Sequence, residues 1–299
     1  MLYRLDEQFK QIRGILNSAK KVLVVSHQNP DSDAVASVLA LYHAFRGRGL
    51  EVLAYLPDPP PHNLGFLPGF FEIKTSIGSF EPDAMVCLDY GDFRRLRLPE
   101  NILNKKDCRI ITIDHHLESD QRGEVLIVEP SLSSTSEIIY DWFQYEGLEI
   151  NKDIATLLLT GIFSDSGGFC HASTTPKTMN IVSELLLKGA PFNKIVRQTV
   201  NYQKPLGLCR IWGQVLADTK VDEATGLAYS SLTAEDLVKS GAKLADFDGI
   251  TNVISAASRI NLGVFLVEYE KGMVKGSLRS EPHGGKNVAQ IVKALGKTR

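Results

Sequence analysis

The chain has 299 residues, of which 43% are hydrophobic and 23% charged, values that are ordinary for a globular protein with a full core. Its length favours two domains, since domains cluster at roughly 100–200 residues. The formal net charge of -2 excludes a strongly basic surface, so a long polyanion is not the expected partner, whereas a short one is compatible.

Cysteine usage and the N-terminus both favour the cytoplasm. The four cysteines are scattered without a CxxC spacing, which argues against a disulfide framework or a zinc ribbon. Residues 1–21 carry charge throughout, so they predict an amphipathic helix and not a signal peptide. No apolar stretch reaches the roughly 20 residues that cross a bilayer, so we expect no membrane contact.

The first part of the chain alternates apolar runs with segments of helical periodicity. This pattern predicts an α/β domain with a mostly parallel sheet. After the helix at 1–21, the expected elements are strands at 22–26, 51–56, 84–88, 109–113 and 125–128, with helices at 34–48, 134–145, 152–163 and 178–188 and a Pro- and Gly-rich loop at 57–70.

From about residue 190 the pattern changes to a helical linker and then to a smaller α+β domain. The predicted boundaries are 1–190 for the first domain, 191–218 for the linker and 219–299 for the second domain. In the second domain we expect strands at 226–232, 262–268 and 273–278, helices at 234–240, 249–258 and 287–295, and a hairpin turn at 269–272.

Residues that bind hard cations follow three of the predicted strands and one helix. The carboxyl ends of parallel strands meet at one edge of a sheet, so these side chains are expected to converge. Clustered carboxylates repel one another, and a cation is the usual reason to hold them together. The residues concerned are His27, Asp31, Asp33, Asp89, Asp114, His115, His116 and Asp165.

Six of these residues form a ligand set with a formal charge of -4, which two divalent cations would cancel. An oxygen-rich set with imidazole and no thiolate suits manganese, or magnesium, better than structural zinc. Two metals about 3.5–4 Å apart form a clamp for phosphoryl chemistry. No Ser or Cys with a partnering base is evident, which favours direct attack by water. The set is Asp31, Asp33, Asp89, Asp165, His27 and His115.

At this point the sequence resembles the DHH phosphoesterase superfamily, named for the triplet seen here at 114–116. Its other motifs are present as HQNPDSDA at 27–34, LDYGDFRRL at 88–96 and GIFSDSGGF at 161–169, and Ser134-Thr135-Ser136-Glu137 follows the triplet as in these proteins. Together with the second domain, the resemblance covers nearly the whole chain.

The resemblance implies a role for each ligand. His116 would lie beside the scissile phosphate as a hydrogen-bond donor or acid, and Asp114 would orient His115 through the far ring nitrogen. His116 and Asp89 are therefore the expected catalytic residues. One metal would be bound by His27 and Asp31, the other by Asp33, His115 and Asp165, with Asp89 as the bridge.

The second domain carries expected substrate contacts. The segment 276–280 resembles the SLRS segment of the DHH-associated domain, in which the arginine, here Arg279 beside Ser277, grips a substrate phosphate through its guanidinium fork. Asn252 and Arg259 lie on the preceding predicted helix and are expected to face the substrate cleft. Arg95 either contacts substrate or pairs with a carboxylate, and the sequence leaves both open.

The match departs from the family at two places. The first motif has Ser32 and Ala36 where glycine is usual, and we expect only a local effect. Such domains normally close with a GGGH segment after their last helix, whereas this chain ends in residues 294–299 (ALGKTR) and carries His283-Gly284-Gly285 before that helix. The chain is therefore expected to be truncated or divergent there, which affects substrate grip and not metal binding.

This domain type occurs in small oligoribonucleases (nano-RNases), which are similar to 3'-phosphoadenosine-5'-phosphate (pAp) phosphatases. The leading expectation is therefore a manganese-dependent phosphoesterase that hydrolyses short oligoribonucleotides from one end, and pAp as a second substrate. The alternatives are a cyclic or linear dinucleotide phosphodiesterase, an inorganic pyrophosphatase, or a nucleotide-binding regulatory protein without catalysis. A homodimer is compatible with the sequence.

Overall fold

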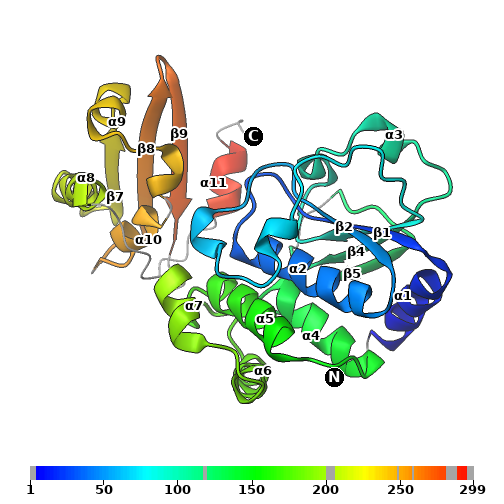
Figure 1. Cartoon of the computed structure of the whole chain (residues 1–299). Helices are drawn as coiled ribbons and strands as arrows, with labels where there is room; N and C mark the ends of the chain where they lie inside the picture. Colours follow the sequence, from blue (N-terminus) through cyan, green and yellow to red (C-terminus); the bar gives the residue numbers. More distant parts are fainter. Residues whose placement is uncertain are drawn as a thin grey trace. The chain divides into compact units, whose positions relative to one another are not determined.

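The chain folds into two compact units, Met1–Tyr202 and Gln203–Arg299. The division lies within the segment 191–218, which contains the helices α7 (Phe192–Thr199) and α8 (Leu206–Ala217). The computed structural model, shown in Figure 1, describes residues 5–116, 120–199, 206–247, 249–257, 259–280 and 288–294.

The first unit is built on a parallel five-stranded sheet with the order β2-β1-β3-β4-β5. The order reverses between β1 and β3, because the chain adds β2 on one side and then continues on the other. Both strands at the reversal are almost fully buried, as near-continuous apolar runs predict. The strands are β1 (Lys21–Val25), β2 (Glu51–Tyr55), β3 (Ala84–Leu88), β4 (Arg109–Asp114) and β5 (Val125–Val128).

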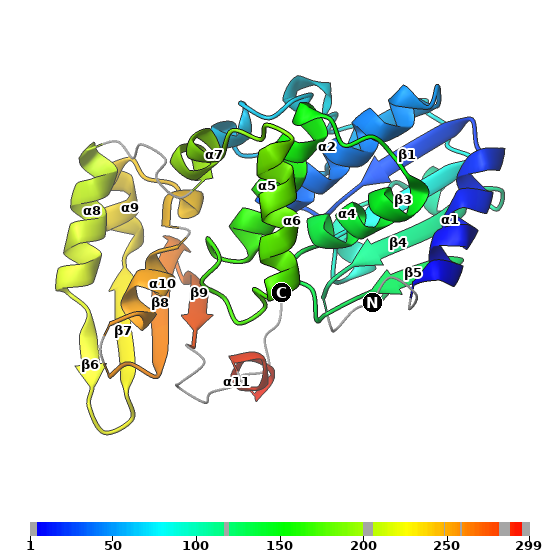
Figure 2. The same ribbon diagram turned by 90° about the horizontal axis from the view of Figure 1, so that it is seen from below.

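Helices pack on one face of this sheet, where Val22 and Val24 join the main hydrophobic core. Figure 2 shows α4 lying beside β4, and α5 packs against α2 and α4. On the other face, Leu23 and Val25 join a smaller core that includes Ile102. The helices of the unit are α1 (Asp6–Ser18), α2 (Ser32–Gly47), α3 (Glu100–Leu103), α4 (Thr135–Glu146), α5 (Lys152–Asp165) and α6 (Pro176–Leu187), with short 3-10 turns η2 (His62–Leu64), η3 (Phe70–Glu72) and η4 (Phe93–Leu96).

The second unit is a mixed sheet with the order β6-β7-β8-β9, in which the β7–β8 pair is parallel and the other pairs are antiparallel. The predicted α/β and α+β classes are thus confirmed, as is the hairpin between β8 and β9. The three-residue strand β6 was not predicted, because it is exposed throughout and has no apolar pattern. The elements are β6 (Lys220–Asp222), β7 (Leu227–Leu232), α9 (Ala234–Ser240), η5 (Leu244–Phe247), α10 (Ile250–Ser255), β8 (Leu262–Glu270), β9 (Met273–Arg279) and α11 (Val288–Ala294). Among the described residues, no helix has the length and apolarity that a membrane span requires.

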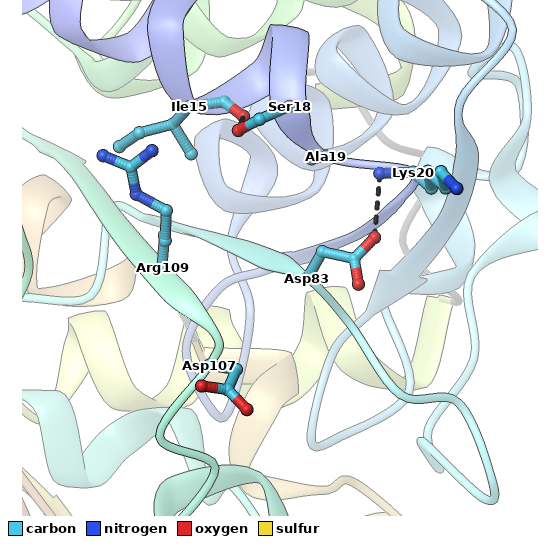
Figure 3. A pocket seen from close by; sticks show the side chains of 7 residues that line it. All are labelled: Ile15, Ser18, Ala19, Lys20, Asp83, Asp107 and Arg109. Atoms are coloured by element: carbon cyan, nitrogen blue, oxygen red, sulfur yellow. Dashed lines mark hydrogen bonds between the residues drawn. The ribbon is translucent and has the colours of Figure 1, made fainter.

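At the amino ends of the strands, Asp83 ties two chain segments together. Its Oδ2 accepts hydrogen bonds from the backbone N–H groups of Lys20 and Lys21, at 2.8 and 2.9 Å. Figure 3 shows this carboxylate beside Lys20 in a hollow of about 330 Å³. These two hydrogen bonds lower the pKa of Asp83.

We expect Asp83→Ala to lower the free energy of unfolding at pH 7 by roughly 1 kcal/mol for each hydrogen bond lost. A carboxyl whose pKa is lowered by folding stabilises the protein above its unfolded pKa of about 3.9, and this contribution disappears as the pH falls through the folded value. The difference between Asp83→Ala and wild type should therefore shrink in thermal melts below pH 4. Asp107→Ala, in the same hollow, is the control, and an unchanged difference at pH 3 would contradict the linkage.

Candidate metal centre

The metal ligands predicted from the sequence lie at the carboxyl edge of the first unit's sheet, where the strand order reverses. After β1 the chain turns at Asn29, which has a left-handed φ of 50°, and enters α2. Asp31 caps this helix, since its Oδ1 accepts a hydrogen bond from Ala34 N at 3.0 Å. Asp33 lies in the first turn of the same helix and is buried. One short segment thus delivers three candidate ligands.

The candidate ligands form clusters that share residues. In each cluster, one ligand atom from each residue lies within 4.8 Å of the others. The clusters His27–Asp31–Asp89 and Asp89–His115–His116 share Asp89, and the second is linked through His115 to Asp33–His115–Asp165. The structure therefore brings all six expected metal ligands together.

Asp89 lies at the centre of the arrangement and presents one oxygen to each side. Its Oδ2 is 3.9 Å from His27 Nε2, and its Oδ1 is 3.5 Å from His115 Nε2. The residue has a left-handed φ of 53°, a conformation that a short polar side chain tolerates best. Burial, followed by the charges of Asp33 and neighbouring carboxylates, raises the pKa of Asp89 well above its usual value. A buried carboxylate in such surroundings favours the binding of a cation.

His27 is held so that Nε2 faces the carboxylates. Its Nδ1 lies 2.7 Å from the Gln28 carbonyl and 2.9 Å from Arg95 Nη2, whereas Nε2 lies 3.9 Å from Asp31 Oδ2. Burial lowers the pKa of His27, which favours the neutral imidazole that binds metals. Arg95 also donates to the Tyr90 carbonyl at 3.0 Å. The structure thus places Arg95 against an imidazole and a carbonyl, whereas the sequence left open a substrate contact or a carboxylate partner.

Asp114 interacts with His116, so the expectation that it orients His115 is wrong. Its Oδ1 lies 2.8 Å from His116 Nδ1 and accepts the His116 backbone N–H at 3.0 Å. The other oxygen accepts the N–H groups of Tyr90 and Gly91. The physical reason is the turn after β4: an aspartate readily bonds the backbone two residues further on, which carries His116 to the Asp114 carboxylate. This hydrogen bond raises the pKa of His116.

On the far side of Asp89, His115 Nε2 lies 3.1 Å from Asp165 Oδ2, at the end of α5. The buried Asp33 accepts hydrogen bonds from the backbone N–H of Thr135 at 2.7 Å and of Ser136 at 3.2 Å, and from the Ser136 hydroxyl. Burial raises the pKa of Asp33. No pattern in the sequence indicated a site role for Thr135 or Ser136, although Ser134 and Glu137 have the spacing of a helix cap.

Apart from Arg95, which lies in the first unit, the expected substrate contacts belong to the second unit. Ser277 and Arg279 are half-buried on β9 and lie two residues apart, so they share a face of the strand. Asn252 is exposed on α10. Arg259 does not lie on this helix, which ends at Ser255, and it has a left-handed φ of 68°. The expectation for Arg259 was wrong in this respect because the helix is shorter than its apolar pattern. The segments 281–287 and 295–299, which carry His283 and the chain end, lie outside the described residues.

The donor set fits two divalent cations. The two imidazoles present Nε2 to carboxylate oxygens at 3.1–3.9 Å, and Asp89 offers a separate oxygen to each side. Carboxylates and imidazoles without thiolate suit hard or intermediate divalent ions. The hollow of Figure 3 is lined by Lys20, Asp83 and Arg109, at the opposite ends of the strands, and it is separate from this centre.

Several known proteins are similar to this chain in sequence or in structure. The pattern described as DHH family, N-terminal domain, matches residues 21–162. The bifunctional oligoribonuclease and PAP phosphatase NrnA of Thermus thermophilus is 32% identical over 97% of this chain and 85% of its own length. A crystal structure of an exopolyphosphatase-related protein from Bacteroides fragilis has a TM-score of 0.86 and 30% identity, over 92% of this chain and 83% of that one. A probable manganese-dependent inorganic pyrophosphatase of Streptococcus thermophilus is 27% identical over 77% of this chain and 68% of its own.

Proposed function

Because the chain belongs to the DHH family of phosphoesterases, we propose that it hydrolyses short oligoribonucleotides from one end and also acts on pAp. The observation that carries this proposal is Asp89, whose two oxygens face two separate groups of ligands. That geometry suits a pair of divalent cations. We propose that both are Mn2+, because the ligand set combines carboxylates with imidazoles. The cytoplasm is the proposed location, since the four cysteines are free thiols.

Two bound cations would neutralise the phosphate oxygens and make water a better nucleophile. The chain's own residues contribute orientation and proton transfer. We propose that His116, held by Asp114 through Nδ1, presents its remaining ring nitrogen to the leaving oxygen as hydrogen-bond donor or acid. The raised pKa of His116 keeps the imidazole protonated to higher pH, as an acid requires. The Gln28 carbonyl, which can accept the Nδ1–H of His27, keeps Nε2 of this ring turned towards Asp31 and Asp89.

Arg279 and Ser277 are proposed to bind a substrate phosphate, and Asn252 and Arg259 are proposed as further substrate contacts. The Thermus relative, which covers nearly the whole chain, supports an RNA or nucleotide substrate. The pyrophosphatase relative covers a smaller share of the chain, so inorganic pyrophosphate is the second candidate substrate.

The product profile of the purified protein tests this proposal. With Mn2+, we expect mononucleotides from di- to pentaribonucleotides and orthophosphate from pAp. If the protein released orthophosphate from pyrophosphate and left the RNA intact, the proposed ribonuclease activity would be wrong and a pyrophosphatase activity would take its place. The same measurements with Mg2+ identify the preferred metal, and light scattering decides between a monomer and the homodimer that the sequence allows.

Arg279→Ala is expected to raise KM for a triribonucleotide by about tenfold or more, since a charge-assisted hydrogen bond contributes about 1.5–3 kcal/mol. Mn2+ affinity should not change, because Arg279 belongs to the other unit. Initial rates and calorimetric Mn2+ titration give the two quantities. Lys275→Ala, on the same strand, is the control. An unchanged KM would remove Arg279 from the proposed site.

A further inference from the structure

Thr135, the first residue of α4, contacts two carboxylates of the metal centre. Its backbone N–H donates to Asp33 Oδ2 at 2.7 Å, and its hydroxyl donates to Asp89 Oδ1 at 3.0 Å. Asp33 lies in the first turn of α2 and Asp89 directly follows β3, so Thr135 joins side chains from two segments that are far apart in the sequence. The three residues are at most 1% exposed, which shields both hydrogen bonds from water.

The hydroxyl of Thr135 binds the Asp89 oxygen that faces His115. This oxygen lies 3.5 Å from His115 Nε2, whereas the other oxygen faces His27. A carboxylate oxygen that accepts one hydrogen bond keeps a lone pair for a cation. The hydrogen bond therefore restricts the rotation of the carboxylate, and this rotation decides whether each oxygen meets its own group of ligands.

The segment around Thr135 is itself firmly held. Ser134 caps α4 by accepting the Glu137 N–H at 3.1 Å. The buried Glu137 carboxylate accepts hydrogen bonds from the Ser133 hydroxyl at 2.7 Å and from the Thr178 hydroxyl at 3.1 Å, and it lies 3.4 Å from Lys177 Nζ. Such a network gives Thr135 one position, which a positioning role requires.

We propose that Thr135 is a positioning residue of the metal centre, and that its hydroxyl orients Asp89 for binding two cations. This inference rests on the proposed two-metal site. Hydrogen-bond partners of metal ligands typically change metal affinity by about 10–100-fold when they are removed. The hydroxyl of Thr135 therefore controls how tightly the centre holds its cations.

Calorimetric titration of the metal-free full chain with Mn2+ tests this role. Thr135→Val keeps the branched shape and the backbone N–H but removes the hydroxyl, and we expect Mn2+ affinity to fall by about 10–100-fold. Thr135→Ser restores the hydroxyl and should bind Mn2+ close to the wild-type value. If the valine variant does not fold, Thr135→Ala also removes the hydroxyl with a smaller side chain, and its Mn2+ affinity is compared with that of wild type.

Thr160→Val is the matched control. Thr160 is as fully buried as Thr135, but its hydroxyl donates to the Thr156 carbonyl one turn earlier in α5, at 2.7 Å. We expect its Mn2+ affinity to stay at the wild-type value. The positioning role of Thr135 would be wrong if Thr135→Val and Thr135→Ala bound Mn2+ with wild-type affinity, or if Thr160→Val lost as much affinity. Either result would leave the metal centre itself in place. A wild-type protein that binds no Mn2+ would overturn the metal centre as well.

Discussion

Asp89→Asn is expected to lower hydrolysis by about 10³-fold or more, because it removes the charged ligand that we propose to be common to two metals. Asparagine keeps the size of the side chain and an oxygen that can accept the Thr135 hydroxyl. It also tolerates the left-handed backbone at this position. The loss would therefore report the charge of the bridge and not a change of shape. Initial rates on a triribonucleotide with Mn2+ give the measurement.

The same substitution should raise the melting temperature of the metal-free protein. Burial and the neighbouring carboxylates raise the pKa of Asp89, so its ionised form costs stability above the unfolded pKa. Asp92→Asn is the matched control: hydrogen bonds from Arg94 lower the pKa of Asp92 to about 2, so this variant should lose stability at neutral pH and keep its activity. Retained hydrolysis in Asp89→Asn would refute the bridging role.

Gly161→Ala is expected to lower the free energy of unfolding by about 1–3 kcal/mol and to weaken Mn2+ binding. A Cβ at this position would lie 2.0 Å from Ser136 Oγ and 2.3 Å from Asp33 Oδ1. The helix α5 must then move away from these groups, and Asp165, one turn further on, moves with it. Thermal melts and Mn2+ titration of the metal-free protein measure the two effects.

Gly14→Ala supplies the control for this substitution. Gly14 lies inside α1, and a Cβ there would meet no atom within 4 Å. Alanine is a better helix former than glycine, so the variant should gain roughly 0.5–1 kcal/mol and bind Mn2+ normally. If Gly161→Ala gained stability in the same way, the close approach of α5 to Asp33 would not be required.

The parallel sheet and the position of the ligands could be predicted because both follow from local rules. Apolar runs such as Ala84–Leu88 identify strands, and parallel strands place their following residues at one edge. The aspartates and histidines after these runs therefore converge without any knowledge of side-chain packing. In the second sheet, the hairpin of β8 and β9 could be predicted from its turn. The parallel β7–β8 pair joins strands that α9 and α10 separate in the sequence, and it was not predicted.

The partners of individual side chains could not be predicted. Asp114 bonds His116 because of the turn after β4, and Arg95 reaches His27 from a segment 68 residues away in sequence. Thr135 contacts Asp89 only once α4 has packed beside β4. In these cases tertiary packing decides how a side chain is oriented. Hydrophobic periodicity predicts helices and strands but not these contacts between side chains.

The wide separation of the ligands along the chain has a thermodynamic consequence. The ligands run from His27 to Asp165, so each bound cation would cross-link loops that the unfolded chain must otherwise close at an entropic cost. A ligand that binds only the folded state adds its binding free energy to stability, about 2.7 kcal/mol at a concentration 100 times its Kd. When such cations are scarce in the cell, the enzyme would therefore lose its catalytic turnover and, because it is less stable, also have a shorter lifetime.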